Sequence, residues 1–243
     1  TPPKRTAFSA SALTRHVADL ARKWDRLVIK VPDSAGSEGN FILRSRDVLG
    51  PNLAAIHRRL MHDLSMNGRK PVFPLLVEVW DANVLTSPSV QTWIPMRNDG
   101  PPVIETIFEQ VLHGENAAFA GAVPADLDPL VERQLASGAL RLATLFQELG
   151  FFGRCSFDAL LTGTDGQAPT LHWIECNARW GGASVPMSLV HRLWPGRAQP
   201  QYAVVQNDDG AYRAIDVAQA LEEFGGGLPI KNHQSGVVFL SPN

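Results

Sequence analysis

The sequence predicts an α+β fold with two subdomains, each built around an antiparallel sheet. Three observations lead to this prediction. Short apolar runs alternate with amphipathic helices in the first third of the chain, two later pairs of strands are joined by turn-rich segments, and a long helix lies between those pairs. Apolar residues make up 44% of the chain, which is enough to form a core.

In the first subdomain, predicted over residues 1–86, Leu13, Val17 and Leu20 recur at helical spacing after Ser9 or Ser11 as an N-cap. The pattern therefore predicts a helix near the start of the subdomain. This helix is expected over residues 12–23. The elements expected after it are strand 27–31, glycine loop 34–40, strand 41–43, helix 53–64 and strand 72–80.

In the second subdomain, predicted over residues 87–243, an Asp-Gly turn signal joins two strands, and Gly150 closes the longest helix of the chain. Turn residues at 162–167 join a second pair of strands into a hairpin. The elements expected here are strands 90–96, 102–112, 154–161, 170–177 and 202–205, helix 127–149, helix 217–224 and strand 237–240.

Composition excludes several classes of protein. The 22 basic and 24 acidic residues give a net charge of −2, which disfavours nucleic-acid binding, and no apolar run approaches the ~20 residues of a membrane span. Cys155 and Cys176 cannot build a disulfide framework, so a cytoplasmic location is expected. Each is an odd number of residues from Asp158 or Glu175, so we expect both cysteines on the opposite strand face, as buried apolar side chains. Because Thr1-Pro2-Pro3 resembles neither a start nor a signal peptide, we expect a segment of a longer chain.

The predicted hairpin of residues 154–177 carries the most informative side chains. Strand alternation places Glu175 with Asn177 on one face, and a turn centred on Thr164-Asp165 with a few extra loop residues would place Asp158 roughly across from Glu175. Two carboxylates and an amide oxygen suit Mg²⁺, a hard cation that completes its coordination with phosphate oxygens and water. The alternative is that these residues lie on the solvent-exposed face of a hairpin without any metal.

The glycine loop is the second candidate element. Gly36 and Gly39 would let main-chain N–H groups approach phosphate oxygens, with Lys30 adding a positive charge. The loop lacks the Gly-Lys-Ser/Thr of a Walker motif, and no helix follows it as in a Rossmann motif. A hairpin turn without ligand, beside a surface lysine, is the competing interpretation.

The order of these pieces resembles the ATP-grasp superfamily of carboxylate–amine ligases over residues 1 to about 190. The most specific match is IECNARWGG, close to the pattern Ile-Glu-x-Asn-x-Arg-x-Gly, and the opening TPPKRTAFSASAL resembles the start of the central subdomain. The resemblance implies a nucleotide held between two antiparallel sheets, with ATP and Mg²⁺ as cofactors. It also implies that residues 1–86 are the central subdomain, residues 87–243 the C-terminal subdomain, and that a preceding domain is absent.

The resemblance also implies roles for individual residues. Lys30 is similar to the lysine on the ATP phosphates, and Arg179 to the arginine facing the transferred phosphoryl group. The glycine loop, through Ser34, Gly36, Ser37 and Gly39, is similar to the phosphate-covering loop. Glu78, Val79, Trp80 and Asp81 are similar to the adenine-binding hinge, and Asp158, Glu175 and Asn177 to the Mg²⁺ ligands.

The match departs from the family pattern after the hinge. The acidic residue that binds the ribose hydroxyls has no counterpart in residues 82–87, where Asn83 or Ser87 would have to substitute. A second phosphate-binding lysine would lie upstream of Thr1. Residues 107–124 and the tail SGVVFLSP look most similar to peptide ligases related to the pheganomycin-type enzyme.

The substrates implied are small carboxylates and amines, such as amino acids or peptides, and a homodimer is a further expectation. The residues assigned to the substrates are Glu109, which would orient the amine, Arg154, Gly181 and Gly182. Arg154 lies four residues before Asp158 and would bind a carboxylate or form a structural ion pair. The competing functions are a nucleotide-binding module without chemistry and an interaction domain.

Overall fold

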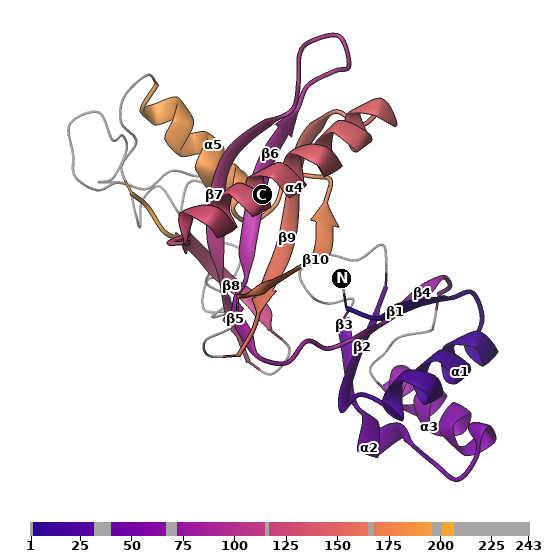
Figure 1. The fold of residues 1–243 in the computed structure, drawn as a ribbon. Helices are drawn as coiled ribbons and strands as arrows, with labels where there is room; N and C mark the ends of the chain where they lie inside the picture. The colour runs from indigo at the N-terminus through magenta and orange to yellow at the C-terminus, as the bar shows by residue number, and fades with distance from the viewer. Residues whose placement is uncertain are drawn as a thin grey trace, which may run out of the picture.

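The computed structural model describes residues 2–31, 40–66, 72–114, 117–164, 168–195 and 201–206. Strands in these residues form two antiparallel sheets, which lie in two lobes (Figure 1). The predicted α+β fold with two antiparallel sheets is therefore confirmed. Helix 217–224 and strand 237–240, both expected from the sequence, lie outside the described residues.

The first lobe contains a four-stranded sheet in the order β1-β4-β2-β3, with helices packed on one side of it (Figure 1). Its elements are β1 (Lys4–Ala7), α1 (Ala10–Ala21), β2 (Arg26–Lys30), β3 (Asn40–Arg44), α2 (Ser45–Val48), α3 (Leu53–Met66) and β4 (Leu75–Val79).

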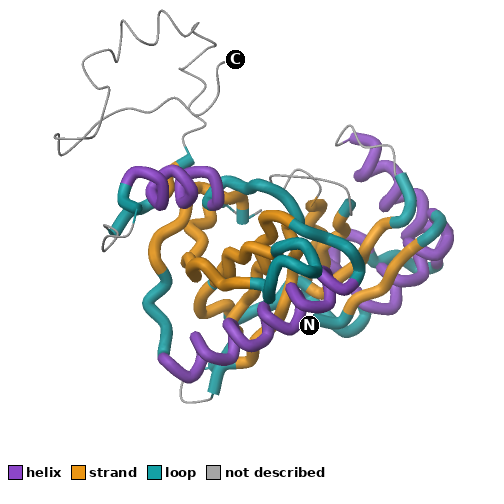
Figure 2. Tube along the Cα trace, turned by 90° about the horizontal axis from the view of Figure 1, so that it is seen from above, coloured by secondary structure: helices purple, strands orange, loops and turns teal. Residues whose placement is uncertain are grey.

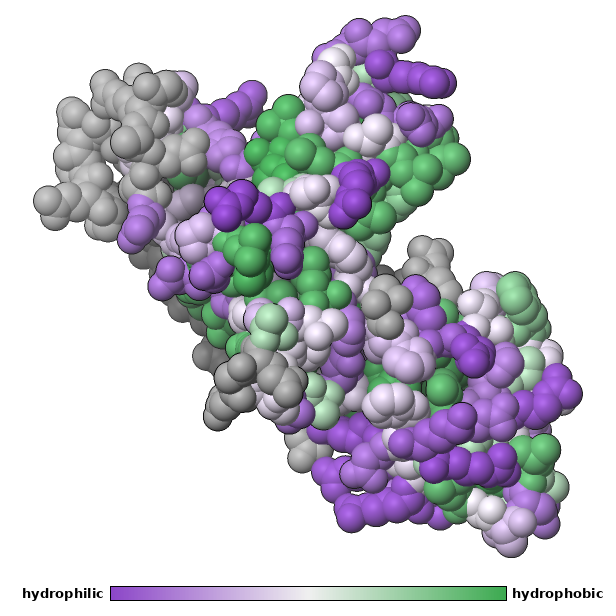
Figure 3. All heavy atoms as spheres, viewed as in Figure 1, coloured by the Kyte–Doolittle hydropathy of each residue, from purple (hydrophilic) through white to green (hydrophobic). Residues whose placement is uncertain are grey.

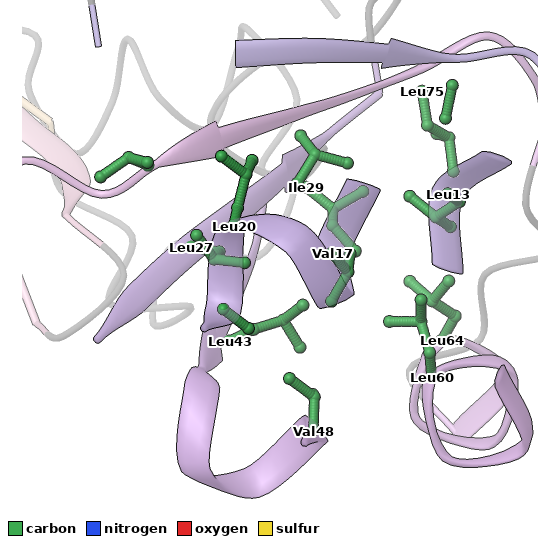
Figure 4. Packing of buried hydrophobic residues seen from close by; sticks show 14 residues of the cluster. Leu13, Val17, Leu20, Leu27, Ile29, Leu43, Val48, Leu60, Leu64 and Leu75 are labelled. Carbon is green, nitrogen blue, oxygen red and sulfur yellow. The ribbon is translucent and has the colours of Figure 1, made fainter. Parts of the chain in front are cut away.

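The core of the first lobe lies between this sheet and its helices. Figure 4 shows Leu13 and Val17 of α1 beside Leu60 of α3, with Leu27 and Ile29 of β2 on the sheet side. Each fully buried side chain of this kind contributes about 1.5 to 3 kcal/mol. Because strands alternate, residues 28, 30 and 78 lie on the opposite face of the sheet, away from the helices.

The second lobe contains a seven-stranded sheet in the order β10-β9-β6-β7-β8-β11, with β5 paired to β9. Figure 2 shows α4 and α5 on opposite faces of this sheet. The elements are β5 (Val84–Thr86), β6 (Pro88–Ile94), β7 (Val103–His113), β8 (Ala118–Pro124), α4 (Pro129–Glu148), β9 (Gly153–Thr162), β10 (Thr170–Asn177), α5 (Ser184–Leu193) and β11 (Val204–Val205).

Two signals predicted from the sequence, Ser9 and Gly150, lie at helix ends, whereas the cap at Asp128 was not predicted. The Ser9 side chain accepts a hydrogen bond from the Ala12 N–H at 3.2 Å, and Asp128 accepts one from the Leu130 N–H at 2.7 Å. Gly150, just after α4, has φ +95°, the left-handed conformation that favours glycine at a helix end.

Five elements were missed from the sequence: β1, α2, β5, β8 and α5. The strands among them are short or rich in small residues, so their apolar alternation is weak. α5 contains Pro186 in its first turn, where proline is tolerated. In the sequence alone, a proline at this position argues against a helix, so α5 was not predicted. Residues 84–86, assigned from the sequence to the first subdomain, form β5 in the sheet of the second lobe.

The two lobes differ at the surface seen in Figure 3. Hydrophilic residues cover most of the first lobe in this view, whereas apolar residues gather over parts of the second lobe. No helix in the described ranges combines the length and apolar character needed to span a membrane.

Candidate functional site

The β9–β10 hairpin brings two carboxylates opposite each other. Asp158 and Glu175 are direct partners in the antiparallel ladder, as expected from the sequence, and Asn177 pairs with Ser156. Residues two apart on a strand share a face. These side chains therefore share the face of the sheet opposite α4, which we call the site face.

A β-bulge between Trp173 and Glu175 creates this arrangement. Trp173 pairs with Ala159 and packs in the cluster under α4, whereas Glu175 pairs with Asp158 on the other face. Ile174 is the additional residue of the bulge. Its main-chain carbonyl accepts a hydrogen bond of 3.3 Å from Nζ of Lys30, which belongs to the first lobe.

Asp158 is a buried carboxylate held by neutral donors. It exposes only 6% of its surface. Oγ of Ser89 donates to its Oδ1 at 2.6 Å, and Nδ2 of Asn177 donates to its Oδ2 at 3.0 Å. Burial raises the pKa of Asp158 to about 6; the negative charge of Glu175 adds to this shift and the Ser89 hydrogen bond opposes it.

Arg179 extends this polar network beyond the end of β10. Its Nη2 donates to Oδ1 of Asn177 at 3.1 Å, and its Nη1 donates to the main-chain carbonyl of Trp180 at the same distance. Its charge also acts to lower the pKa of Asp158, although this effect is smaller than that of burial. The guanidinium of Arg179 is thus linked to the Asp158 carboxylate through one side chain, that of Asn177.

The donor set fits a hard divalent cation. Asp158, Glu175 and Asn177 offer oxygen ligands, and the two carboxylates face each other without a cationic side chain bonded to either of them in the described residues. A cation beside them would offset both the burial of the Asp158 charge, which is the main cause of its raised pKa, and the smaller repulsion from Glu175. The described residues contain no group of three or more His, Cys, Asp or Glu residues that could hold a metal, so the proposed site relies on two carboxylates and the amide oxygen of Asn177.

Lys30 reaches the second lobe from the first. Its Nζ lies 2.7 Å from Oε2 of Glu78, a carboxylate that is only 4% exposed. Together with the Ile174 carbonyl, this ion pair fixes the lysine side chain between the sheets. The glycine-loop residues expected to act with it, Ser34, Gly36, Ser37 and Gly39, lie outside the described residues.

The segment predicted as the hinge, residues 78–81, begins in the last two residues of β4 and contacts both lobes. Nδ1 of His172, on β10, lies 2.8 Å from Oδ2 of Asp81. The N–H of Trp80 donates to the Arg26 carbonyl at 3.0 Å, and the Arg26 guanidinium lies over the Trp80 ring at 5.4 Å. This side of the segment is therefore fixed to β2.

The other hinge residues have defined main-chain contacts. The N–H of Val79 donates to the carbonyl of Pro3, the residue before β1, at 3.0 Å, so this donor is occupied. Asn83 has φ +57°, and its carbonyl accepts from the Gly163 N–H at 3.1 Å. Asn83 thus joins the hinge to the end of β9.

Arg154 forms an ion pair with Glu105 and lies between two indole rings. Its guanidinium carbon is 5.4 Å from the ring centre of Trp93 and 5.2 Å from that of Trp180. Burial lowers the pKa of Arg154. The structure contains the ion pair, and the assignment of Arg154 to a substrate carboxylate stays a prediction.

The remaining substrate residues differ in their position relative to Asp158: Glu109 faces away from it, whereas a Cβ on Gly181 would lie 3.8 Å from Nη1 of Arg179. Glu109 accepts hydrogen bonds from the Thr86 hydroxyl and from the Ser87 N–H, and its ladder position places it on the face opposite Asp158. Gly181 and Gly182 form the turn before α5. A Cβ on Gly182 would lie 2.9 Å from Cε1 of Phe119, so glycine allows this turn to approach β8.

Sequence reasoning missed the polar residues of β6 and β7 on the site face. Oγ of Ser89 receives a hydrogen bond from Nε2 of Gln91 at 2.9 Å, and Gln110 contributes a further hydrogen bond to Asp158. The signal that could have indicated them is the alternation of polar residues in β6, whose residues 88–92 are all buried. Buried hydroxyl and amide groups need partners, so such a strand indicates a polar network.

The cysteines lie on the face opposite Asp158 and Glu175, as expected. Sγ of Cys155 is 3.5 Å from Sγ of Cys176. Cys155 is buried, but Cys176 is exposed, which corrects the expectation that both are buried apolar residues. The hydrogen bond between them, together with burial, raises the pKa of Cys155.

Comparison with solved structures identifies the architecture. Biotin carboxylase from Campylobacter jejuni, described as an ATP complex, aligns with a TM-score of 0.56 at 14% identity, over 78% of this chain and 39% of that one. D-alanyl-alanine synthetase A from Vibrio cholerae aligns with a TM-score of 0.50 at 14% identity, over 73% of this chain and 50% of that one. The chain has the ATP-grasp fold.

A third structure with this fold contains both nucleotide and magnesium. The biotin carboxylase domain of 2-oxoglutarate carboxylase from Hydrogenobacter thermophilus, in complex with MgADP and bicarbonate, aligns with a TM-score of 0.52 at 14% identity, over 78% of this chain and 39% of that one. The chain therefore spans half or less of the length of these ATP-grasp structures. No protein-family model and no curated protein matches the sequence.

Proposed function

We propose that this chain contributes the nucleotide and metal site of an ATP- and Mg²⁺-dependent carboxylate–amine ligase. The observation that carries the proposal is the convergence of Asp158, Glu175 and Asn177 on one face, with Arg179 bonded to this group and Lys30 reaching β10 from the other lobe. The solved structures with the same fold include enzymes described with ATP, ADP or MgADP, which supports a nucleotide ligand.

The reaction proposed is the activation of a carboxylate by the γ-phosphate of ATP, followed by attack of an amine on the acyl phosphate to give an amide. Positioning and charge neutralisation dominate such phosphoryl transfer. Mg²⁺, held by Asp158, Glu175 and Asn177, would neutralise phosphate charge. Arg179 would bind the transferred group from the end of β10, because its guanidinium is already oriented by Asn177.

Lys30 would supply positive charge from the first lobe. In the structure its charge is balanced by Glu78, so phosphate oxygens must compete with a buried carboxylate for the same ammonium. Adenine would lie against the main chain of residues 78–81, and Asn83 or Ser87 would have to replace the missing acidic contact to ribose. Both features predict weak nucleotide affinity, with each missing charged hydrogen bond costing ~1.5 to 3 kcal/mol.

The second candidate is a nucleotide-binding module without ligase activity. It is favoured by the same two observations, namely the neutralised Lys30 and the missing ribose contact. The proposed substrates also lack defined partners, since Arg154 is occupied by Glu105 and Glu109 by Thr86 and Ser87. The ligase proposal therefore leaves the identity of the carboxylate and amine to experiment.

The test combines ligand binding with turnover. Mg²⁺-ATP should raise the melting temperature, since a ligand at ~100 times its Kd adds about 2.7 kcal/mol to the native state. ADP release should then require a carboxylate and an amine from a panel of amino acids and peptides. Glu175→Gln should lose the Mg²⁺-dependent part of the stabilisation, whereas Glu148→Gln, an exposed residue on α4, should retain it.

Stabilisation by Mg²⁺-ATP without ADP release across the panel would favour the binding module. The ligase assay should use the whole protein, because this chain aligns with only 39% to 50% of the ATP-grasp structures described above.

A further inference from the structure

The only two cysteines of the chain lie in contact beside the proposed metal site. Their sulfur atoms are 3.5 Å apart, across neighbouring strands β9 and β10. Cys176 is exposed and accessible to small reagents, whereas Cys155 is 2% exposed and sits in the core under α4. This is the arrangement of an accessible attacking thiol with a second thiol behind it.

Cys176 is also flanked by two of the proposed metal ligands. Glu175 precedes it and Asn177 follows it on β10, and both side chains lie on the opposite face of the strand. Any displacement of the main chain at Cys176 therefore moves both ligands relative to Asp158, which is fixed on β9 by Ser89.

Closing a disulfide here requires such a displacement. Cys176 pairs directly with Phe157, so Cys155 is its diagonal neighbour in the ladder. Diagonal neighbours have Cα atoms ~7 to 8 Å apart, whereas disulfides usually span ~4.4 to 6.8 Å. The sulfur atoms must also approach by roughly 1.5 Å to reach the S–S bond length. The bond would draw β10 towards β9, and strained disulfides of this kind are the readily reduced ones.

We propose that Cys155 and Cys176 form a reversible intramolecular disulfide, and that this bond weakens Mg²⁺-ATP binding on the site face. The first half of the proposal depends only on the two sulfur atoms. The second half rests on the proposed function, because it assigns Glu175 and Asn177 to the metal.

The oxidant is a small-molecule disulfide such as oxidised glutathione. The thiolate of Cys176 attacks one sulfur of this disulfide, forming a mixed disulfide and releasing one glutathione thiolate. Cys155 loses its proton and attacks Sγ of Cys176, which forms the internal S–S bond and releases the second glutathione. Two cysteine thiols are oxidised, one disulfide is reduced, and the two protons end on the glutathione thiols.

The first measurement is a titration of the protein with graded ratios of reduced and oxidised glutathione. Free thiols are then trapped by alkylation and the mass is measured. The expected product has no free thiol, a mass lower by two hydrogens, and a monomeric position on a non-reducing gel. Two surviving thiols, a stable glutathione adduct on Cys176, or a disulfide-linked dimer would each overturn the internal disulfide.

The second measurement is calorimetry with Mg²⁺-ATP on the reduced and oxidised protein. We expect about tenfold weaker binding after oxidation, comparable to the loss of a supporting residue around a metal. Cys176→Ser and Cys155→Ala should bind equally under both conditions. Equal binding by the reduced and oxidised wild-type protein would overturn the coupling alone. Absence of binding by the reduced protein would overturn the coupling together with the proposed function, while the thiol titration still decides the disulfide.

Discussion

Glu78 in the first lobe and Asp158 in the second are both buried carboxylates, yet their partners differ. Glu78 exposes 4% of its surface and has Lys30 at 2.7 Å. Asp158 exposes 6% and is bonded to a hydroxyl and an amide, with the like charge of Glu175 directly across the ladder. The first carboxylate is neutralised within the protein, and the second is not.

This difference indicates which of the two carboxylates is the candidate for binding a cation. Burying a charge without an opposite charge is costly, and such groups cluster at functional sites where a ligand supplies what is missing. Burial raises the pKa of Asp158 to about 6 because the charged form lacks compensation. We infer that the cation of the proposed site belongs beside Asp158, whereas Glu78 orients Lys30.

The largest expected effect comes from removing the uncompensated charge. Asp158→Asn keeps the volume and removes an anionic ligand, so Mg²⁺-dependent ATP binding should weaken on the order of 1,000-fold, beyond the ~10 to 100-fold typical of outer-shell changes. The fold should survive, since the variant buries no charge at this position. Calorimetry with and without Mg²⁺ checks the binding. Asp126→Asn, an exposed aspartate, is the control. Unchanged binding by Asp158→Asn would remove the metal assignment.

The second test removes the cation from the compensated pair. Lys30→Met leaves Glu78 buried without its partner and should destabilise the protein by about 3 kcal/mol. This is the lower end of the range for breaking a buried ion pair, because the Lys30 side chain is 22% exposed. The double variant Lys30→Met/Glu78→Gln should recover much of this loss. Urea denaturation measures both variants, and their m-values should match that of the wild type.

An exposed ion pair provides the control for Lys30. The side chains of Arg22 and Asp19 are 62% and 73% exposed and lie 3.5 Å apart, so Arg22→Met should change stability by less than about 1 kcal/mol. If Lys30→Met were as mild as Arg22→Met, the buried pair would not hold the lysine in place.

The hairpin that carries Asp158 could be predicted because its signals are local. Turn residues at 162–167 fix the pairing, and alternation then assigns Glu175 and Asn177 to one face. The cap at Ser9 is likewise a local signal. The α+β fold followed from these elements.

The bulge at Ile174 could not be predicted in this way, because it depends on a distant helix. Gly138 of α4 lies so close to Trp173 that a Cβ there would be 2.8 Å from Cζ2 of the indole. Trp173 therefore packs under α4, while Glu175 faces the opposite side of the sheet. Both residues have odd numbers and would share a face in a regular strand, so the extra residue Ile174 shifts the register between them. The positions of Glu109 and Arg154 also depend on pairing with strands far away in sequence.

The pH dependence of stability offers a third test of the comparison. Because the folded-state pKa of Asp158 is about 6 and its ordinary value is 3.8, the native state holds this proton more tightly than the unfolded state. The stabilisation is complete below pH 3.8 and is lost as the pH rises through about 6. The shift corresponds to roughly 2 to 3 kcal/mol at ~1.4 kcal/mol per pKa unit.

Urea midpoints measured between pH 4 and 7 check this contribution against Asp158→Asn, which should lack it. Mg²⁺ binding should show the opposite dependence and weaken as the pH falls below about 6, because protons then compete for the carboxylate. If the two proteins differed by a constant amount at every pH, Asp158 would not titrate in this window.

The smallest expected effect comes from the neutral donor that partly solvates Asp158. Ser89→Ala removes the hydroxyl that donates to Oδ1 at 2.6 Å. A hydrogen bond to a charged group contributes ~1.5 to 3 kcal/mol and one to a neutral group ~0.5 to 1.5, so the loss should be about 1 kcal/mol larger at pH 8 than at pH 4.5. Thr92→Val is the matched control, because the Thr92 hydroxyl donates at 2.7 Å to the neutral carbonyl of Cys155. The free-energy cost of Thr92→Val should be the same at both pH values.

An equal cost for Ser89→Ala at both pH values would mean that the hydroxyl does not distinguish the charged from the protonated form of Asp158. The contrast with Glu78, whose partner Lys30 is itself charged, would then rest on the ion pair alone.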